Sequence, residues 1–148
     1  MNLMDNMDVS FEYFEEHDLA IKDPDTYIGS SPQSMVEQFA RVYGHATDHE
    51  WVKGSRVELL RLLLIKEEAN ETYEADTAEN LIKELADLVY VTYGYAATFG
   101  WDLDEALRRV HASNMSKLGK DGKPIYRDDG KVLKGENYEP PYLKDLVK

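Results

Sequence analysis

Four acidic residues in the middle of the chain have the spacing of a metal site. Glu68 and Glu71 lie three residues apart, and Glu84 and Asp87 repeat that spacing after twelve intervening residues. Residues three or four apart share one face of a helix, so each pair presents two carboxylates to the same side. A carboxylate is costly to bury unless something positive meets it. Two such pairs on adjacent helices therefore predict a divalent cation between them.

The acids also continue the apolar stripes of their helices. Leu60 and Leu64 lead at i, i+4 spacing to Glu68. The apolar stripe of the next predicted helix passes through Glu84, and its other members are Leu81, Leu88, Val91 and Tyr95. A side chain on such a stripe normally faces the protein interior. We therefore expect the carboxylates to point toward other helices.

An ordinary solvated helix face is the alternative explanation for acids at helical spacing. Lys66, Glu74 and Lys83 fit that description, and Glu79 fits a stabilising position near a helix start. Glu68, Glu84 and Asp87 fit it less well, because they line up with leucines. Spacing alone leaves both interpretations open.

The identity of the ligands indicates which cation would bind. Hard carboxylate oxygens select Mg²⁺, with Mn²⁺ as a substitute, over softer ions. Mg²⁺ usually takes only a few carboxylates and completes its shell with water and substrate phosphates. A site of four or five carboxylates can hold more than one ion, and two ions can position an attacking water on a phosphoryl group.

Composition narrows the class of protein. The chain has 148 residues, no cysteine and a net charge of −12, which indicates one domain, no disulfide and no nucleic-acid partner. Its start lacks the features of a signal peptide, and its longest uncharged run, residues 88–101, is too short to span a bilayer. We expect a soluble, cytoplasmic protein with no membrane partner. One segment, residues 116–135, is locally basic, with six basic and three acidic side chains.

The elements that must position the acids follow from capping residues and periodicity. Four helices are predicted, at about residues 32–43, 56–75, 78–99 and 103–118. Their N-caps are predicted at Ser31, at Ser55, at Asp76 or Thr77, and at Asp102 or Asp104. A β-hairpin is predicted within residues 123–134. The fold class is therefore all-α, an antiparallel four-helix bundle over residues 31–148 with a small C-terminal β-hairpin, and residues 1–30 form an N-terminal extension.

The order of these motifs resembles a known family. Arg61-x-x-Leu64-Ile65-x-Glu67-Glu68-x-x-Glu71 followed by Glu84-x-x-Asp87, together with the segment VHASNMSK at residues 110–117, resembles the MazG-like, all-α nucleoside triphosphate pyrophosphohydrolases. These are relatives of phosphoribosyl-ATP pyrophosphohydrolase. The resemblance covers about residues 33–143.

The resemblance implies Mg²⁺-dependent hydrolysis of an NTP or dNTP to the monophosphate and pyrophosphate. Glu68, Glu71, Glu84 and Asp87 then correspond to the metal ligands. Glu67 is expected beside the site, either as a further ligand or as the catalytic base for the attacking water. His111, within VHASNMSK, is expected to pack or hydrogen-bond, because Mg²⁺ prefers oxygen.

The resemblance also suggests residues that bind the nucleotide. Arg61 belongs to the shared motif, while Asn114 and Lys117 are expected to contact phosphate or ribose, with an exposed helix end as the alternative. Tyr126 and Arg127 are expected to close over the triphosphate, with a cross-strand pair as the alternative. The base needs an apolar surface. The candidates for stacking on it are Phe39, Tyr43 and Trp51, each of which can equally be core.

Three functions are compatible with these residues. The leading one is a nucleotide pyrophosphohydrolase acting on the nucleotide pool, and the second is phosphoribosyl-ATP pyrophosphohydrolase with the same metal chemistry. The third, of another class, is a non-catalytic acidic helical interaction module. The resemblance further implies a homodimer or a dimer of dimers, in which a second chain can complete the site.

Overall fold

Each of the four helices begins at a side chain that caps its first turn. The hydroxyls of Ser31, Ser55 and Thr77 and the carboxylate of Asp102 each accept a backbone N–H three residues ahead, at 2.9–3.2 Å. The computed structural model describes residues 31–147. Its helices are α2 (Pro32–Val42), α3 (Arg56–Glu74), α4 (Ala78–Thr98) and α5 (Leu103–Met115), followed by the short 3-10 helix η2 (Lys144–Leu146). The predicted helices are confirmed, although α5 ends about three residues earlier than expected.

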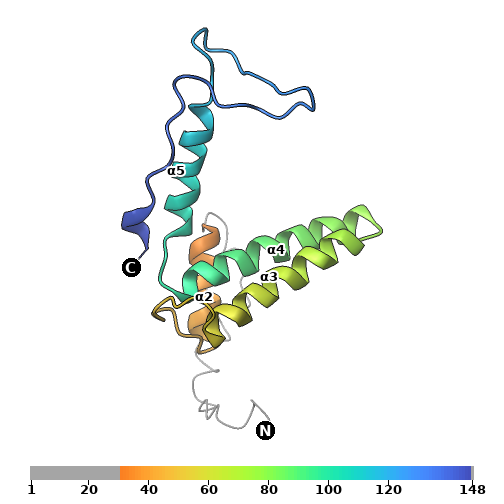
Figure 1. Ribbon diagram of the computed structural model, residues 1–148. Helices are drawn as coiled ribbons and strands as arrows, with labels where there is room; N and C mark the ends of the chain where they lie inside the picture. The colour runs from red at the N-terminus through yellow and green to blue at the C-terminus, as the bar shows by residue number, and fades with distance from the viewer. Residues whose placement is uncertain (1–30, 148) are drawn as a thin grey trace.

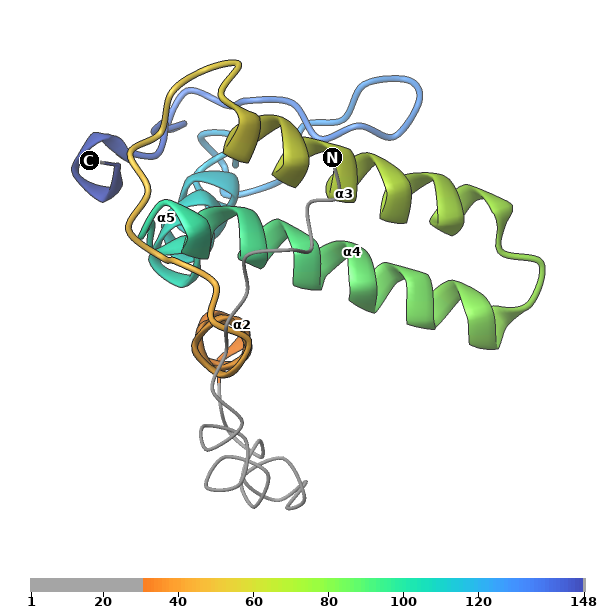
Figure 2. The ribbon, with the colours of Figure 1, turned by 90° about the horizontal axis from the view of Figure 1, so that it is seen from below.

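Two of the helices form a long antiparallel hairpin. α3 and α4 run side by side and are joined by only three residues, 75–77 (Figures 1 and 2). α2 crosses α4 steeply, so that Figure 2 shows α2 end-on while α3 and α4 lie in the plane of the picture. α5 leaves the end of α4 and extends away from the hairpin (Figure 1). We call the part of the α3–α4 hairpin that extends beyond α2 the arm.

The core lies where α2 crosses the C-terminal half of α4. Val36 of α2 packs against Tyr93 and Ala97 of α4, and Leu103 at the start of α5 covers them. Short side chains on α4 allow this close approach: Ala96 and Ala97 are both buried there. The buried Tyr93 hydroxyl bonds to Asp104 of α5. This crossing therefore fixes α2, α4 and the start of α5 relative to one another.

The antiparallel bundle expected from short connections holds only for α3 and α4. The connection between α2 and α3 is long, residues 43–55, which allows α2 to cross the hairpin instead of running along it. The connection between α4 and α5 is short, and Gly100 turns it with a φ of +66° that favours glycine. The four helices do pack into one all-α structure.

The predicted C-terminal β-hairpin is wrong in one respect, because residues 31–147 contain no β-strand. A single antiparallel bridge joins Tyr126 and Val132, with backbone bonds from Arg127 to Lys131 and from Leu133 to Ile125. The turn forms as expected, since Gly130 at φ +85° closes it. The pairing stops there because neither side packs on an apolar surface. Residues 124–133 are all exposed.

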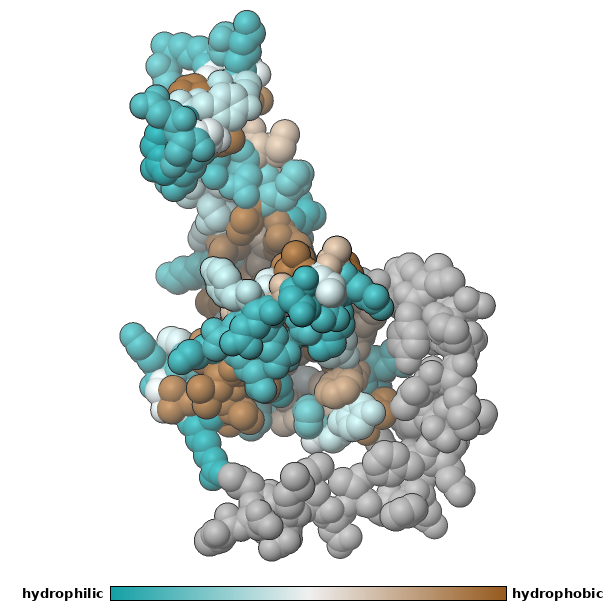
Figure 3. Space-filling view, turned by 90° about the vertical axis from the view of Figure 1, so that its right-hand side faces the viewer, coloured by the Kyte–Doolittle hydropathy of each residue, from teal (hydrophilic) through white to brown (hydrophobic). Residues whose placement is uncertain are grey.

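Large apolar side chains are exposed on the α3–α4 hairpin. Leu63 of α3 is 61% exposed and Ile82 of α4 is 66% exposed, and Leu59, Leu62, Leu85 and Val89 are exposed as well. Figure 3 faces the tip of the arm and shows hydrophobic side chains beside a central group of hydrophilic ones. These side chains are not part of a membrane span, because no helix within residues 31–147 has the length and apolar character to cross a bilayer.

Candidate metal centre

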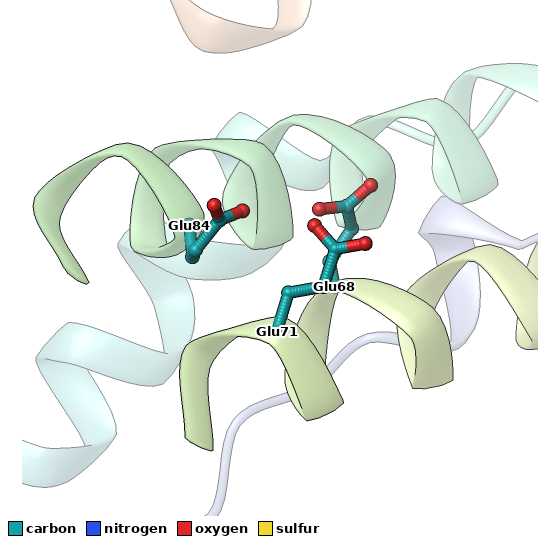
Figure 4. A group of neighbouring side chains, drawn as sticks. All are labelled: Glu68, Glu71 and Glu84. Carbon is teal, nitrogen blue, oxygen red and sulfur yellow. The ribbon is translucent and has the colours of Figure 1, made fainter. Parts of the chain in front are cut away.

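Three of the predicted acids meet between the helices of the arm. Glu68 and Glu71 project from α3 and Glu84 from α4, and one carboxylate oxygen from each lies within 4.8 Å of the others. Figure 4 shows the three carboxylates converging on the space between the two helices. The antiparallel hairpin produces this meeting, because its short connection sets the end of α3 opposite the start of α4. A divalent ion with oxygen ligands at about 2.0–2.6 Å fits such a set.

Glu68 has the environment of a ligand whose partner is a cation. Its Oε2 atom is buried and has no hydrogen-bond partner among residues 31–147. Burial raises the pKa of its carboxyl group, and the negative charges of Glu71 and Asp87 raise it further. A buried carboxylate without a partner is unfavourable, so this atom needs either a proton or a metal ion. The donor set therefore fits Mg²⁺ or Mn²⁺.

Glu71 and Glu84 bring their carboxyl groups within hydrogen-bonding distance of each other. Burial raises the pKa of Glu71, and the charge of Glu84 and the hydrogen bond to it raise that pKa further. Two carboxyl groups can bond directly only when one of them carries a proton. A divalent cation removes this requirement, because both groups can then remain ionised.

Asp87, the fourth predicted ligand, lies outside this trio of oxygens. It pairs with Lys83, whose Nζ lies 2.8 Å from Asp87 Oδ2 and 3.1 Å from Glu84 Oε2. The hydrogen bonds to Asp87 and to Glu84 raise the pKa of Lys83 above its usual value. One lysine faces four acids, so the cluster keeps an excess of negative charge.

Lys83 is a residue that sequence reasoning missed at this site. By its position in the sequence Lys83 fits a solvated helix face, and its i, i+4 spacing to Asp87 is the signal that indicates an ion pair. Glu67, the predicted base, is exposed on α3 and outside the trio. Its charge is nevertheless close enough to raise the pKa of Glu71 slightly. Its catalytic role stays a prediction.

A cavity of about 230 Å³ lies beside the acids, between α2 and the hairpin. It is walled by the rings of Phe39 and Tyr90, which meet edge to face with centroids 5.7 Å apart. Arg61 and Leu64 of α3 and Gly94 of α4 line the same cavity. Leu64 precedes Glu68 by one helical turn, so the cavity and the acids are adjacent on one face of the hairpin.

A larger hollow of about 570 Å³ lies elsewhere, near the starts of α2 and α5. Its acidic side chains already have partners in the fold: Asp102 caps α5, and Glu105 pairs with Arg108. It does not adjoin the Glu68–Glu71–Glu84 trio. The smaller cavity is therefore the one that accompanies the candidate metal centre.

The comparison with known proteins agrees with this geometry. The sequence profile of a family described as phosphoribosyl-ATP pyrophosphohydrolase matches residues 36–114, which is more than half of the chain and includes all four acids. The chain belongs to this family. The matched segment runs from α2 to the end of α5, so the crossing of α2 over α4 and the α3–α4 hairpin both lie in the family domain.

A viral protein is also similar to this chain. An uncharacterized protein of Acanthamoeba polyphaga mimivirus is 32% identical over 124 residues, which cover 76% of this chain and 46% of the viral protein. The chain thus spans about half the length of that relative. Family membership suggests a pyrophosphohydrolase, and the trio of glutamates fits the divalent metal site expected in this family.

The structure separates two aromatic residues that were predicted to stack on the base. Phe39 lines the cavity beside the family's acids. Trp51 instead donates from Nε1 to the Tyr95 hydroxyl at 2.9 Å and lies beside Trp101, with ring centroids 6.3 Å apart. Because Trp51 belongs to this separate aromatic cluster and is not among the residues that line the cavity, the structure does not bring it to the cavity. Tyr43 stacks on Phe39 at 4.4 Å and is outside the cavity lining.

Four further predicted substrate residues lie far from the acids of their own chain. Asn114 and Lys117 are at the end of α5, and Tyr126 and Arg127 are in the loop beyond it, away from the arm (Figure 1). Arg127 pairs with its neighbour Asp129, and Tyr126 is 61% exposed. Within one chain these residues do not join the trio. Residues 1–30, the predicted extension, lie outside the described residues.

Proposed function

We propose that this protein is a Mg²⁺-dependent nucleoside triphosphate pyrophosphohydrolase, which converts an NTP or dNTP and water to the monophosphate and pyrophosphate. The observation that carries the proposal is the Glu68–Glu71–Glu84 trio with its buried, unpartnered Glu68 oxygen. Membership of a pyrophosphohydrolase family supports the reaction type. Water adds to one phosphorus while the anhydride bond to the next phosphate breaks.

In this proposal the arm holds the reacting phosphates through bound cations. Glu68, Glu71 and Glu84 would supply the oxygens, and Asp87, which pairs with Lys83 in this structure, would be the fourth ligand. Such ions, when bound, lower the pKa of a coordinated water and neutralise charge on the phosphoryl oxygens. Glu67 either adds a ligand or takes the proton from the attacking water. Lys83, released from Asp87, is free to turn toward a phosphate.

The test is pyrophosphate release from the four NTPs and the four dNTPs with Mg²⁺, with Mn²⁺ and with EDTA. We expect release that needs the metal and is lost in Glu68→Gln. Glu74→Gln is the matched control, because Glu74 is an exposed acid on the same helix. Release that persists in EDTA, or that survives in Glu68→Gln, would exclude the proposed site.

A second readout measures metal binding without catalysis. A metal that binds only the folded protein raises its melting temperature, by an amount that grows with concentration over Kd. We expect Mg²⁺ or Mn²⁺ to stabilise the wild-type protein and Glu74→Gln equally, and Glu68→Gln much less. Equal stabilisation of all three proteins would show that the cation binds elsewhere.

Phosphoribosyl-ATP is a second candidate substrate, and one observation favours it: the matching family carries that enzyme's name. The metal chemistry would be the same, because the bond broken is again a phosphoanhydride. A pyrophosphate assay with phosphoribosyl-ATP beside the eight simple nucleotides distinguishes the two. Turnover of phosphoribosyl-ATP alone would replace the leading proposal.

We also propose that the active protein is a homodimer or a dimer of dimers. An exposed apolar stripe runs along α4 and consists of Ile82, Leu85 and Val89. Each of these residues is two positions from Glu84 or Asp87, so the stripe lies on nearly the opposite side of the helix from the acids. A second copy of the chain is the occupant that fits, because the family resemblance predicts pairing through the helices and because Lys117 has no place in the site of its own chain. Light scattering with the Ile82→Lys variant tests this, and we expect that variant to be a monomer.

A further inference from the structure

The cavity beside the metal centre contains a positive charge that lacks an acidic partner. Arg61 is half-buried, and within residues 31–147 it makes no ion pair or hydrogen bond to a carboxylate. Burial lowers the pKa of its guanidinium group, with no carboxylate acting in the opposite direction. A desolvated guanidinium has five N–H donors and no acceptor. Its N–H donors are therefore available to a ligand that enters the cavity.

The position of Arg61 relative to the acids suggests which part of a substrate it meets. Arg61 precedes Glu68 by two helical turns, about 10 Å along the axis. Its Nη1 lies beside Gly94, 3.7 Å from where a Cβ would be, which places the guanidinium at the level of Gly94 on α4. Side chains on a helix point toward its N-terminus, so Arg61 is directed away from the phosphate end of the site. The distance leaves room for a sugar between the two.

The size and walls of the cavity fit a nucleobase. Whole small-molecule ligands occupy pockets of about 300–1,000 Å³. A cavity of about 230 Å³ takes one part of a larger ligand. Phe39 and Tyr90 supply aromatic walls on which a planar ring can pack.

The polar groups of the cavity are biased toward donors. No aspartate or glutamate is among its lining residues in the described part of the chain. Its other polar side chains are His45, Thr47, Tyr90 and Thr98, and the Thr98 hydroxyl already donates to the Gly94 carbonyl at 2.8 Å. Burial, followed by the charge of Arg61, lowers the pKa of His45, which favours a neutral imidazole there. The strongest polar group in the cavity is therefore the Arg61 guanidinium, a planar set of N–H donors that we call the donor fork.

We infer that this cavity selects a nucleotide whose base presents a carbonyl oxygen at the pairing edge, a 6-oxopurine or a 4-oxopyrimidine, through hydrogen bonds from Arg61. Guanine and hypoxanthine offer O6 and N7 to such a fork, and uracil and thymine offer O4. Adenine and cytosine place an amino group where the acceptor should be, so the half-buried guanidinium would meet a donor instead of an acceptor. The inference rests on the proposed function, because it names the substrate class of that same site.

The test uses two pairs of substrates that differ at this position. dITP and dATP carry an oxo or an amino group at C6, and dUTP and dCTP carry the same two groups at C4. We expect kcat/KM for the oxo member to exceed that of the amino member by about tenfold or more in both pairs, the usual effect of a hydrogen bond to a charged group. These measurements need only the wild-type protein.

A variant then assigns the preference to Arg61. Arg61→Gln replaces the donor fork with an amide that can both donate and accept, so we expect the oxo-to-amino ratio to fall toward one. Arg56→Gln, an exposed arginine at the start of the same helix, is the matched control and should keep the wild-type ratio. Circular dichroism melting curves of both variants verify that they fold.

The outcomes separate this inference from the proposed function. No pyrophosphate from any of the four substrates would remove the proposed function itself. Turnover of all four at similar rates would leave the function standing and overturn the inference. An equal loss with all four substrates in Arg61→Gln would identify Arg61 as a phosphate or general contact, which also overturns it.

Discussion

The arm and the first turn of α5 both carry clustered acids, but only the acids of α5 have enough positively charged partners within the chain. In the arm, Glu68 has a buried oxygen without a partner, and burial and neighbouring acids raise the pKa of its carboxyl group. At α5, Glu105 bonds to Arg108 and Arg109 at 2.6–2.7 Å, and these bonds, that to Arg108 first, lower the pKa of Glu105 to about 2. Arg109 extends this network to Asp145 at 2.6 Å.

The difference shows how a structural acid can be told from a functional one. The Glu105 network has its positive charges supplied by the chain itself, and it ties the C-terminal segment to α5. The arm has four acids and one lysine, so its charge is balanced only when something else binds. A cluster of like charges that the fold keeps together without compensation indicates a ligand.

The largest expected contrast is in catalysis. Glu68→Gln removes a proposed metal ligand, which should lower kcat/KM on the order of 10³-fold, since metal ions stabilise the transition state by several kcal/mol. Glu105→Gln breaks ion pairs outside the candidate site and should change kcat/KM by less than about threefold. Initial rates of pyrophosphate release measure both. Comparable losses in the two variants would remove the distinction between the two clusters.

A second prediction joins the two regions across a dimer. The end of α5 lies far from the arm of its own chain (Figure 1). In the proposed dimer we expect the site to take Lys117 from the other chain. Glu68→Gln and Lys117→Ala chains should each be poorly active, and a mixture that exchanges subunits should recover about one quarter of the wild-type rate. Half of the dimers are then mixed, and each has one intact site.

The control for this mixing experiment is the pair Glu68→Gln and Glu84→Gln. Both residues belong to the acids of one chain, so mixed dimers contain no intact site and should remain inactive. If the first pair also stays inactive although both variants are dimeric, Lys117 does not complete the site of a neighbouring chain.

Local signals in the sequence predicted the helices and the positions of the acids. Caps at Ser31 and Ser55 and the short turn after Glu74 were enough to place the starts of α2 and α3 and the hairpin, because these features depend on a few neighbouring residues. The same reasoning overestimated the hairpin near Tyr126. A bridge and a turn formed there, but strands need a packed face that local sequence does not reveal.

Features that depend on helix crossing could not be predicted. Because α2 crosses α4, Phe39 faces the cavity, whereas Trp51, in the connection after α2, joins a separate aromatic cluster. The crossing angle of the two helices cannot be read from periodicity or composition. The lack of an acidic partner for Arg61 also depends on the helix crossing, because the crossing determines which side chains of α2 and α4 lie near it. The motif identified Arg61, and the structure shows what is unusual about it.

The smallest predicted effect concerns stability against pH in metal-free protein, and it has opposite signs in the two clusters. Glu68 has a raised pKa in the folded state, so its favourable contribution is present below the ordinary carboxyl pKa and is lost as pH rises through the raised value. Glu105 has a lowered pKa, so its contribution is present above the ordinary carboxyl pKa and is lost as pH falls toward about 2.

Glutamine mimics a protonated glutamate, so the two variants should differ from wild type in opposite directions near pH 7. In EDTA, Glu68→Gln should melt higher than wild type and Glu105→Gln lower, by no more than about 2–4 °C each, because both clusters are partly exposed. The Glu68→Gln advantage should vanish near pH 4, whereas the Glu105→Gln deficit should persist until the pH approaches about 2. Shifts of the same sign would mean that the acids of the arm are balanced by the fold after all, and that no cation is needed to explain why they stay together.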